Sequence, residues 1–155
     1  MAIPTKKLIE ECNDLIRLDH DALGAYDEAI EKIDTPVIRS QLEVFRADHE
    51  RHVVELSAIV RQHGGSPPEK AGARGIIRKT MTRIAGLMGV EPTLTAMRSN
   101  EKVLTEQYQK RLSLDLPAEV KEVIARNFGD EQRHLAWIEQ AIKTRLWEAH
   151  VSPTP

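Results

Sequence analysis

The sequence predicts an all-α protein, a bundle of four long helices arranged as two antiparallel hairpins with a long crossover that carries a short helix. Apolar residues recur at alternating steps of three and four over four stretches of the 155 residues, the period of helices that bury one face. Clusters of proline or glycine separate these stretches, and none of them alternates like a β-strand. Aromatic residues make up only 4% of the chain, which suits an aliphatic core between helices.

The expected long helices cover residues 5–33, 36–63, 92–113 and 117–149, and a short amphipathic helix covers 76–88, all in a single domain of residues 1–155. Thr35 can cap the second helix and Pro36 fits its first turn, while Gly64 follows its end. The residues expected to face the core are Leu8, Cys12, Leu15, Ala22, Tyr26, Ala29 and Ile33, then Ile38, Leu42, Phe45, Leu56 and Ile59, then Leu94, Met97, Leu104 and Tyr108, and finally Val120, Ile124, Ile138 and Ala141.

The length of the connection between the second and third helices predicts the topology. About 28 residues (64–91) lie there, whereas an up-and-down bundle needs only a short loop. A helix of roughly 28 residues spans about 42 Å, a distance that a short helix with extended pieces can cross. The third helix is therefore expected to run parallel to the second.

Charge and composition restrict the cellular setting. The formal net charge of -2 does not favour nucleic acid as a partner. Cys12 is the only cysteine, which excludes an internal disulfide and suits a reducing compartment. The N-terminal residues 1–11 contain no apolar run long enough for a signal peptide or a membrane span. We therefore expect a cytoplasmic protein. As a separate expectation, the protein forms a homo-oligomer, in the first place a homodimer.

Ionisable residues interrupt the apolar face of each long helix at mid-height. They are Asp19 in the first helix, His49 and His52 in the second, Glu101 in the third, and Glu131 and His134 in the fourth. An unpaired buried carboxylate costs several kcal/mol, so three of them in one core need partners. Either they pair with the histidines in a metal-free polar network, or all six bind metal ions.

The two halves of the chain repeat this pattern in register. Asp19 precedes His49 by 30 residues and His52 by 33, and Glu101 precedes Glu131 and His134 by the same intervals. The midpoints of these intervals fall at about residues 35 and 117, where proline and capping signals already predict the turns. The ionisable residues of each hairpin are therefore expected at one height, and residues three apart on a helix face the same way.

A carboxylate on one helix followed by Glu-x-x-His on the next, repeated twice, resembles the pattern of ferritin-like proteins such as bacterioferritins and rubrerythrins. Glu101 with Glu131-Gln132-Arg133-His134 matches that pattern in full, and the tyrosines seven residues after each first carboxylate resemble those of small bacterial ferritin-like proteins. The resemblance implies two iron or manganese ions, with Asp19, His49, His52, Glu101, Glu131 and His134 as ligands.

Two positions depart from the family pattern. His49 stands where the family has a glutamate, and Asp19 stands for the other glutamate. Three carboxylates leave about one positive charge on two divalent ions, which a hydroxide would offset; the alternative is a site for one metal. Zinc is compatible with the same ligands.

Four further residues flank the expected ligands. Asp48 and Asp130 directly precede the paired ligands and are candidates to accept hydrogen bonds from the outer nitrogens of the histidines, or else they are plain surface carboxylates. The resemblance implies that Tyr26 and Tyr108 hydrogen-bond to carboxylates across the bundle.

The resemblance also implies an oxidoreductase of the ferroxidase or peroxidase type, which oxidises Fe(II) or reduces peroxide or oxygen in bacterial stress defence. The alternative is a non-enzymatic stress or interaction protein whose polar core is free of metal and fixes the register of the helices. Iron storage in a hollow cage ranks third, because no fifth helix is evident before Pro155.

Overall fold

A computed structural model describes residues 2–69 and 81–149 of the chain. Four long helices account for most of them: α1 (Thr5–Lys32), α2 (Pro36–Gln62), α4 (Val90–Leu112) and α5 (Ala118–Lys143). The described residues contain no β-strand. The predicted all-α class is confirmed, and each long helix begins within two residues of its predicted start.

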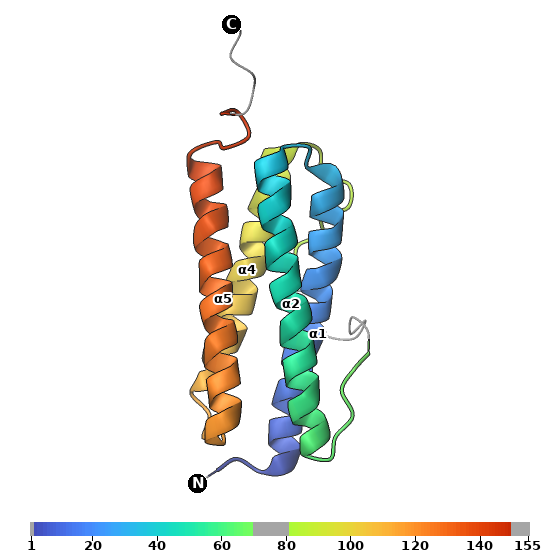
Figure 1. Cartoon of the computed structure of the whole chain (residues 1–155), viewed down its shortest axis with the longest axis vertical. Helices are drawn as coiled ribbons and strands as arrows, with labels where there is room; N and C mark the ends of the chain where they lie inside the picture. The colour runs from blue at the N-terminus through green and yellow to red at the C-terminus, as the bar shows by residue number, and fades with distance from the viewer. Residues whose placement is uncertain (1, 70–80, 150–155) are drawn as a thin grey trace, which may run out of the picture.

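The four helices form two antiparallel hairpins, α1 with α2 and α4 with α5, each closed by a short turn (Figure 1). Helix α2 ends at one end of the bundle and α4 begins at the other, so the connection between them runs along the bundle and α2 and α4 are parallel (Figure 1). The hairpins pack through α1 against α4 and α2 against α5. This arrangement confirms the two hairpins and the long crossover.

The core consists of two apolar halves with a polar band between them. Every residue expected to face the core is buried. Leu8 and Ile59 belong to the half near the start of α1, whereas Ile33 and Ile38 belong to the half at the α1–α2 turn. The band between the halves contains ionisable side chains from all four helices, and its position follows from the register of the two turns.

Helix α5 ends at Lys143, so the predicted extension to residue 149 is wrong. The N–H of Arg145 donates to the carbonyl of Ile142, and the N–H of Leu146 donates to the carbonyl of Ala141. These two bonds form a Schellman motif, with Arg145 in the left-handed region at φ 49°. Glycine usually occupies that position, and arginine gives no stop signal in the sequence.

The end of α2 has the same motif with the usual residue. The N–H groups of Gly64 and Gly65 donate to the carbonyls of Arg61 and Val60, and Gly64 has φ 86°. The glycine signal therefore predicted this end correctly, to within one residue.

Two glycines should respond in opposite directions to replacement by alanine. Gly64→Ala is expected to lower the free energy of unfolding by about 1 kcal/mol, because a Cβ is disfavoured at positive φ. Gly129→Ala should raise it by about 0.5–1 kcal/mol, because Gly129 lies inside α5 with open space around its Cβ position. Urea denaturation of both variants beside the wild type measures these changes. A change of the same sign in both variants would contradict the backbone conformations described for the two glycines.

The predicted short helix at 76–88 is wrong over its described part, because residues 81–88 contain no helix; residues 76–80 lie outside the described residues. The side chain of Asn100 on α4 holds this segment in a non-helical conformation. Its Oδ1 accepts from the N–H of Thr82 at 2.6 Å, and its Nδ2 donates to the carbonyl of Thr82 at 3.0 Å. Ile84 then buries its side chain in the core.

No helix in the described ranges 2–69 and 81–149 combines the length and apolar character that a membrane crossing needs.

Candidate metal centre

All six side chains singled out in the sequence meet in the polar band at the middle of the bundle. Helices α1 and α4 supply one carboxylate each, whereas α2 and α5 each supply two groups spaced three residues apart on one face. All six are fully buried, with none of their surface exposed: Asp19, His49, His52, Glu101, Glu131 and His134.

Asp19 lies between the two histidines of α2. Its Oδ1 is 2.8 Å from Nδ1 of His49 and 3.1 Å from Nδ1 of His52. Oε1 of Glu131 faces the same two nitrogens, at 3.5 Å from His49 and 3.3 Å from His52. Four donor atoms from three helices therefore surround one point, and we call Asp19, His49, His52 and Glu131 the first quartet.

A second group of the same kind lies beside the first. Nδ1 of His134 is 3.4 Å from Oε2 of Glu131 and 3.6 Å from Oε2 of Glu101. Nε2 of His49 is 3.2 Å from Oε1 of Glu101. We call His49, Glu101, Glu131 and His134 the second quartet; in each quartet the possible ligand atoms all lie within 4.8 Å of one another. The quartets share His49 and Glu131.

Several buried atoms at this centre have no hydrogen-bond partner of ordinary geometry. They are both carboxylate oxygens of Glu131, Oε2 of Glu101 and Nδ1 of His134. All four belong to the second quartet, and two of them are on Glu131, which the quartets share. Buried polar atoms without partners are rare and costly; here, hydrogen bonds of Glu101 with Glu131 and His134 outside ordinary geometry contribute to the pKa values of the two glutamates.

The outer nitrogens of two histidines bind carboxylates of the opposite hairpin. Nε2 of His52 on α2 is 3.0 Å from Oδ2 of Asp130 on α5, and Nε2 of His134 on α5 is 2.8 Å from Oδ2 of Asp48 on α2. Both histidines therefore direct Nδ1 toward the centre. Such an outer contact fixes the orientation of a histidine ring.

Two arginines hold these aspartates from the outside. Arg51 contacts both Asp130 and Asp48, and Arg133 contacts Asp48 at 2.8 Å and Asp130 at 3.1 Å. Sequence reasoning missed both arginines. The signal was available, because Asp-x-x-Arg occurs in each half of the chain at equivalent positions, Asp48 with Arg51 and Asp130 with Arg133.

The two tyrosines cross the bundle in the same reciprocal way. Tyr26 on α1 donates its hydroxyl to Oε1 of Glu101 on α4 at 2.5 Å, and Tyr108 on α4 donates to Oδ2 of Asp19 on α1 at 2.5 Å. Burial and the neighbouring carboxylate raise the pKa of each hydroxyl well above its usual value. Both phenols therefore remain protonated hydrogen-bond donors.

The three buried carboxylates differ in their electrostatic surroundings. Burial alone would raise the pKa of Asp19, but His52 and His49 outweigh it and lower this pKa to about 2. Burial opposes ionisation of Glu101 too, yet His134 and His49 hold its pKa well below the usual value. Burial and the charge of Glu101 instead raise the pKa of Glu131 well above the usual value. In the protein without metal, Glu131 thus carries a proton that a cation would replace.

His49 acts as an internal cation in this state. Its ring contacts a carboxylate oxygen through each nitrogen, an arrangement in which both nitrogens donate. Burial would lower its pKa, but the hydrogen bonds to Asp19 and Glu101 prevail and raise the pKa to about 10. The pKa of His52 is raised as well, since Asp19 and Asp130 outweigh the effect of burial.

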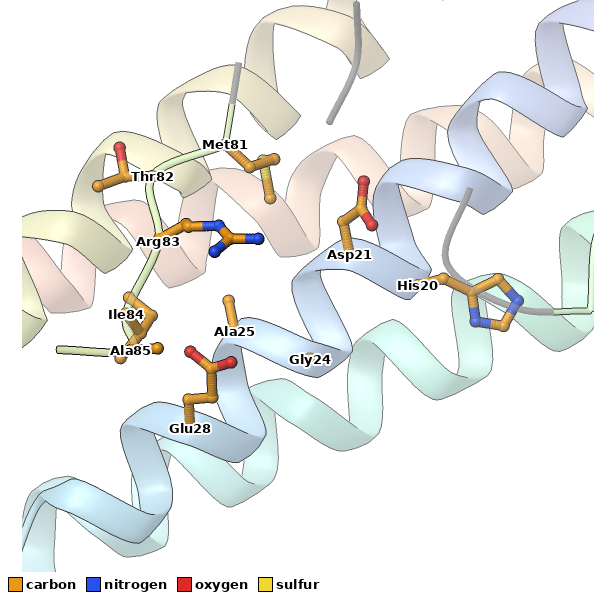
Figure 2. A pocket seen from close by; sticks show the side chains of 10 residues that line it. All are labelled: His20, Asp21, Gly24, Ala25, Glu28, Met81, Thr82, Arg83, Ile84 and Ala85. Atoms are coloured by element: carbon orange, nitrogen blue, oxygen red, sulfur yellow. The ribbon is translucent and has the colours of Figure 1, made fainter. Parts of the chain in front are cut away.

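Other candidates lie away from the centre. A surface hollow of about 250 Å³ lies between the outer face of α1 and residues 81–85 of the crossover, with Arg83 extending toward α1 (Figure 2). It is lined by none of the six residues at the centre. His20 is at its edge and contacts the carbonyl of Pro68. Burial raises the pKa of the Cys12 thiol to about 11, so Cys12 is a protonated core residue at neutral pH.

Residues 7–113 match the protein family described as "Domain of unknown function (DUF2383)". The chain belongs to this family. The match to the DUF2383 family includes α1, α2 and α4 and stops before α5, so Glu131 and His134 lie beyond it. No curated protein sequence shows significant similarity to the chain.

A solved structure gives the fold of this DUF2383 member. The crystal structure of ferritin-like, diiron-carboxylate proteins from Bacillus anthracis str. Ames superposes with a TM-score of 0.73, over 92% of this chain and 99% of the other, at 19% sequence identity. The chain therefore has the ferritin-like fold, as the sequence pattern predicted. Its buried histidine and carboxylate groups are consistent with a di-metal site.

Proposed function

We propose that this protein binds two divalent iron or manganese ions through the two quartets, with Asp19, His49, His52, Glu101, Glu131 and His134 as ligands. Asp19 and His52 belong only to the first position, and Glu101 and His134 only to the second. Glu131 and His49 lie between the two positions, and Glu131 directs one oxygen toward each.

The observation that carries this proposal is the set of four buried atoms without hydrogen-bond partners. A polar network that only fixed helix register would be expected to satisfy its own members. Here the pairing of His49 with Asp19 and Glu101 leaves both oxygens of Glu131 and Nδ1 of His134 unsatisfied. Nδ1 of His134 lies 3.4 Å from Oε2 of Glu131 and 3.6 Å from Oε2 of Glu101, so one cation among these three atoms would satisfy them together, while Oε1 of Glu131 faces the first quartet.

The spacing of the donor atoms supports the same conclusion. Nitrogen and oxygen ligands lie about 2.0–2.2 Å from a transition metal, so ligands on opposite sides of an ion are about 4.2 Å apart. The donor atoms of each quartet lie within 4.8 Å of one another, and a contraction of a few tenths of an ångström is enough.

The ligand types favour iron or manganese. Three carboxylates and three imidazoles form a mixed oxygen and nitrogen set without a thiolate. Asp48 and Asp130 accept hydrogen bonds from the outer nitrogens of His134 and His52, and their own charges are balanced by Arg51 and Arg133. Zinc fits the same donors, so a metal competition experiment has to include it.

The proposed activity is oxidation of Fe(II) or reduction of peroxide or oxygen. A pair of redox-active ions supplies electrons for such chemistry when bound. The chain supplies the surroundings: complete burial of the six side chains excludes bulk water, and Tyr26 and Tyr108 hold two carboxylates by hydrogen bonds. The aspartate contacts fix both outer histidine rings.

Anaerobic loading tests the proposal directly. Metal-free protein is incubated with Fe(II) or Mn(II), desalted and analysed for bound metal, and two ions per chain are expected. Oxygen or hydrogen peroxide is then added to the iron-loaded protein, and formation of Fe(III) is followed by absorbance. A His134→Ala variant, which lacks a ligand of the second quartet only, should retain one ion. Wild-type protein without metal above trace would end the proposal.

Replacing either outer aspartate should weaken metal binding without removing a ligand. Asp48→Asn and Asp130→Asn are each expected to lower the affinity for Co(II) or Zn(II) about 10–100-fold, because each holds the ring of a liganding histidine. Competition with a chelating dye measures the affinity. Asp34→Asn, at an exposed position between α1 and α2, is the matched control. Equal metal affinities of all three variants would show that Asp48 and Asp130 are surface carboxylates without a role in metal binding.

A further inference from the structure

The apolar core positions of α2 have one exception to the internal repeat when they are compared with α5. Residues 82 positions apart are equivalent, as Asp19 and Glu101 or His52 and His134 illustrate. The apolar core residues of α2 have apolar equivalents in α5 at the same offset: Ile38 with Val120, Leu42 with Ile124, Leu56 with Ile138 and Ile59 with Ala141. Phe45, however, is equivalent to Asn127. One end of the centre therefore has an aromatic ring where the other has an amide.

Asn127 is fully buried, and neither its Oδ1 nor its Nδ2 has a hydrogen-bond partner of ordinary geometry. It lies one turn before Glu131 on the same face of α5. Its amide also lies beside the hydroxyl of Tyr108, and a hydrogen bond between them outside ordinary geometry acts to lower the pKa of that hydroxyl, against the larger opposing effects of burial and Asp19. Tyr108 in turn donates to Asp19 and packs against the ring of His52 at 5.7 Å. The amide is therefore at the end of the centre that the first quartet occupies.

Phe45 closes the opposite end. Its ring lies 4.3 Å from the ring of His134 and contacts Trp137 edge-on at 5.8 Å. The second quartet is thus covered by aromatic carbon, which offers no hydrogen bond to an additional ligand. A buried amide with two unused hydrogen-bonding groups offers both a donor and an acceptor.

We infer that Asn127 is the residue that binds a small oxygen ligand, of the class of water, hydroxide or hydroperoxide, at the first quartet, and that Phe45 excludes such a ligand from the second. The inference rests on the proposed metal centre. Ligands of this class both donate and accept hydrogen bonds, which matches an amide whose Oδ1 and Nδ2 have no partner of ordinary geometry. An asparagine that served only packing would cost stability relative to an apolar residue such as Phe45 at the equivalent position.

Binding of azide to the cobalt-loaded protein tests this inference. Cobalt(II) is spectroscopically visible and does not turn over, and azide accepts hydrogen bonds through its terminal nitrogens. Asn127→Leu keeps the volume of the side chain and removes both polar atoms. This variant is expected to take up as much cobalt as the wild type and to bind azide at least tenfold more weakly, because one hydrogen bond to a charged ligand is lost. Phe45→Leu is the matched control at the equivalent position and should not weaken azide binding.

The outcomes separate this inference from the proposed function. Wild-type protein that takes up no cobalt contradicts both. Normal cobalt uptake by Asn127→Leu with unchanged azide affinity overturns the role of Asn127 alone, as does a loss of affinity in Phe45→Leu instead. Asn127→Ala is the second variant. Loss of cobalt from both Asn127 variants would also overturn the inference, because the amide would then support the metal ligands themselves.

Discussion

Replacement of Glu131 by glutamine is expected to abolish binding of both metal ions while leaving the metal-free protein at least as stable as the wild type. Glu131 is the carboxylate that the two quartets share, and its two oxygens face the two positions separately. The amide of glutamine is a poor ligand for a cation. In the metal-free state, however, Glu131 already carries a proton because burial and Glu101 raise its pKa well above the usual value, so a neutral amide replaces a neutral acid.

Thermal unfolding with and without metal measures both parts of this expectation. A ligand present at about 1,000 times its Kd stabilises the native state by about 4 kcal/mol, which for a chain of this size corresponds to a shift in Tm of about 8–16 °C. The wild type should show such a shift with Mn(II), and Glu131→Gln should show none. Glu122→Gln, at an exposed position of the same helix, is the control and should behave as the wild type. A full shift in Glu131→Gln would remove Glu131 from the ligand set.

The metal-free protein is expected to lose stability as the pH rises from neutral to alkaline. The folded state raises the pKa of His49 from 6.5 to about 10, so the stability that this histidine contributes is complete below pH 6.5 and is lost as the pH rises toward 10. The raised pKa values of His52 and Glu131 act in the same direction. The loss should be on the order of 2–3 kcal/mol between pH 7 and pH 9. The lowered pKa of Asp19, about 2, contributes stability above pH 4 that is lost only in acid.

Urea unfolding of chelator-treated protein at several pH values tests this dependence. His49→Gln should be less stable than the wild type at pH 6 and should lose less stability between pH 7 and pH 9. His63→Gln is the control, because the ring of His63 lies outside the centre and contacts the carbonyl of Ile59 at the end of α2. Metal binding should have the opposite pH dependence, because a cation competes with protons for the same atoms. A free energy of unfolding that is constant or rises toward pH 9 would contradict the assigned charge of His49.

Periodicity predicted the bundle because the spacing of apolar residues along a helix determines which face packs against the other helices. Residues such as Leu15, Leu42 and Ile124 face the core wherever the helix lies, and proline at positions 36 and 117 fixed the turns between them. The register of those turns in turn placed Asp19 level with His49 and His52. The convergence of the six side chains therefore followed from the spacing of residues in the sequence.

The features that the sequence did not reveal depend on contacts between distant segments. The end of α5 was missed because Arg145 occupies the left-handed position that glycine usually marks. The conformation of residues 81–88 depends on the side chain of Asn100, eighteen residues away from Thr82, which no local pattern reports. Asn127 was overlooked because a single polar residue on an apolar face is unremarkable until its equivalent, Phe45, is compared with it.

An anomalous-scattering map of the manganese- or iron-loaded crystal tests the central claim most directly. Two peaks are expected at the middle of the bundle, one bounded by Asp19, His52 and Glu131 and the other by Glu101, His134 and Glu131. Nδ1 of each of these two histidines should point at its peak while Nε2 keeps its contact with an aspartate. A map without a peak among these residues, with the six side chains in the same hydrogen bonds as in the metal-free protein, would contradict the account.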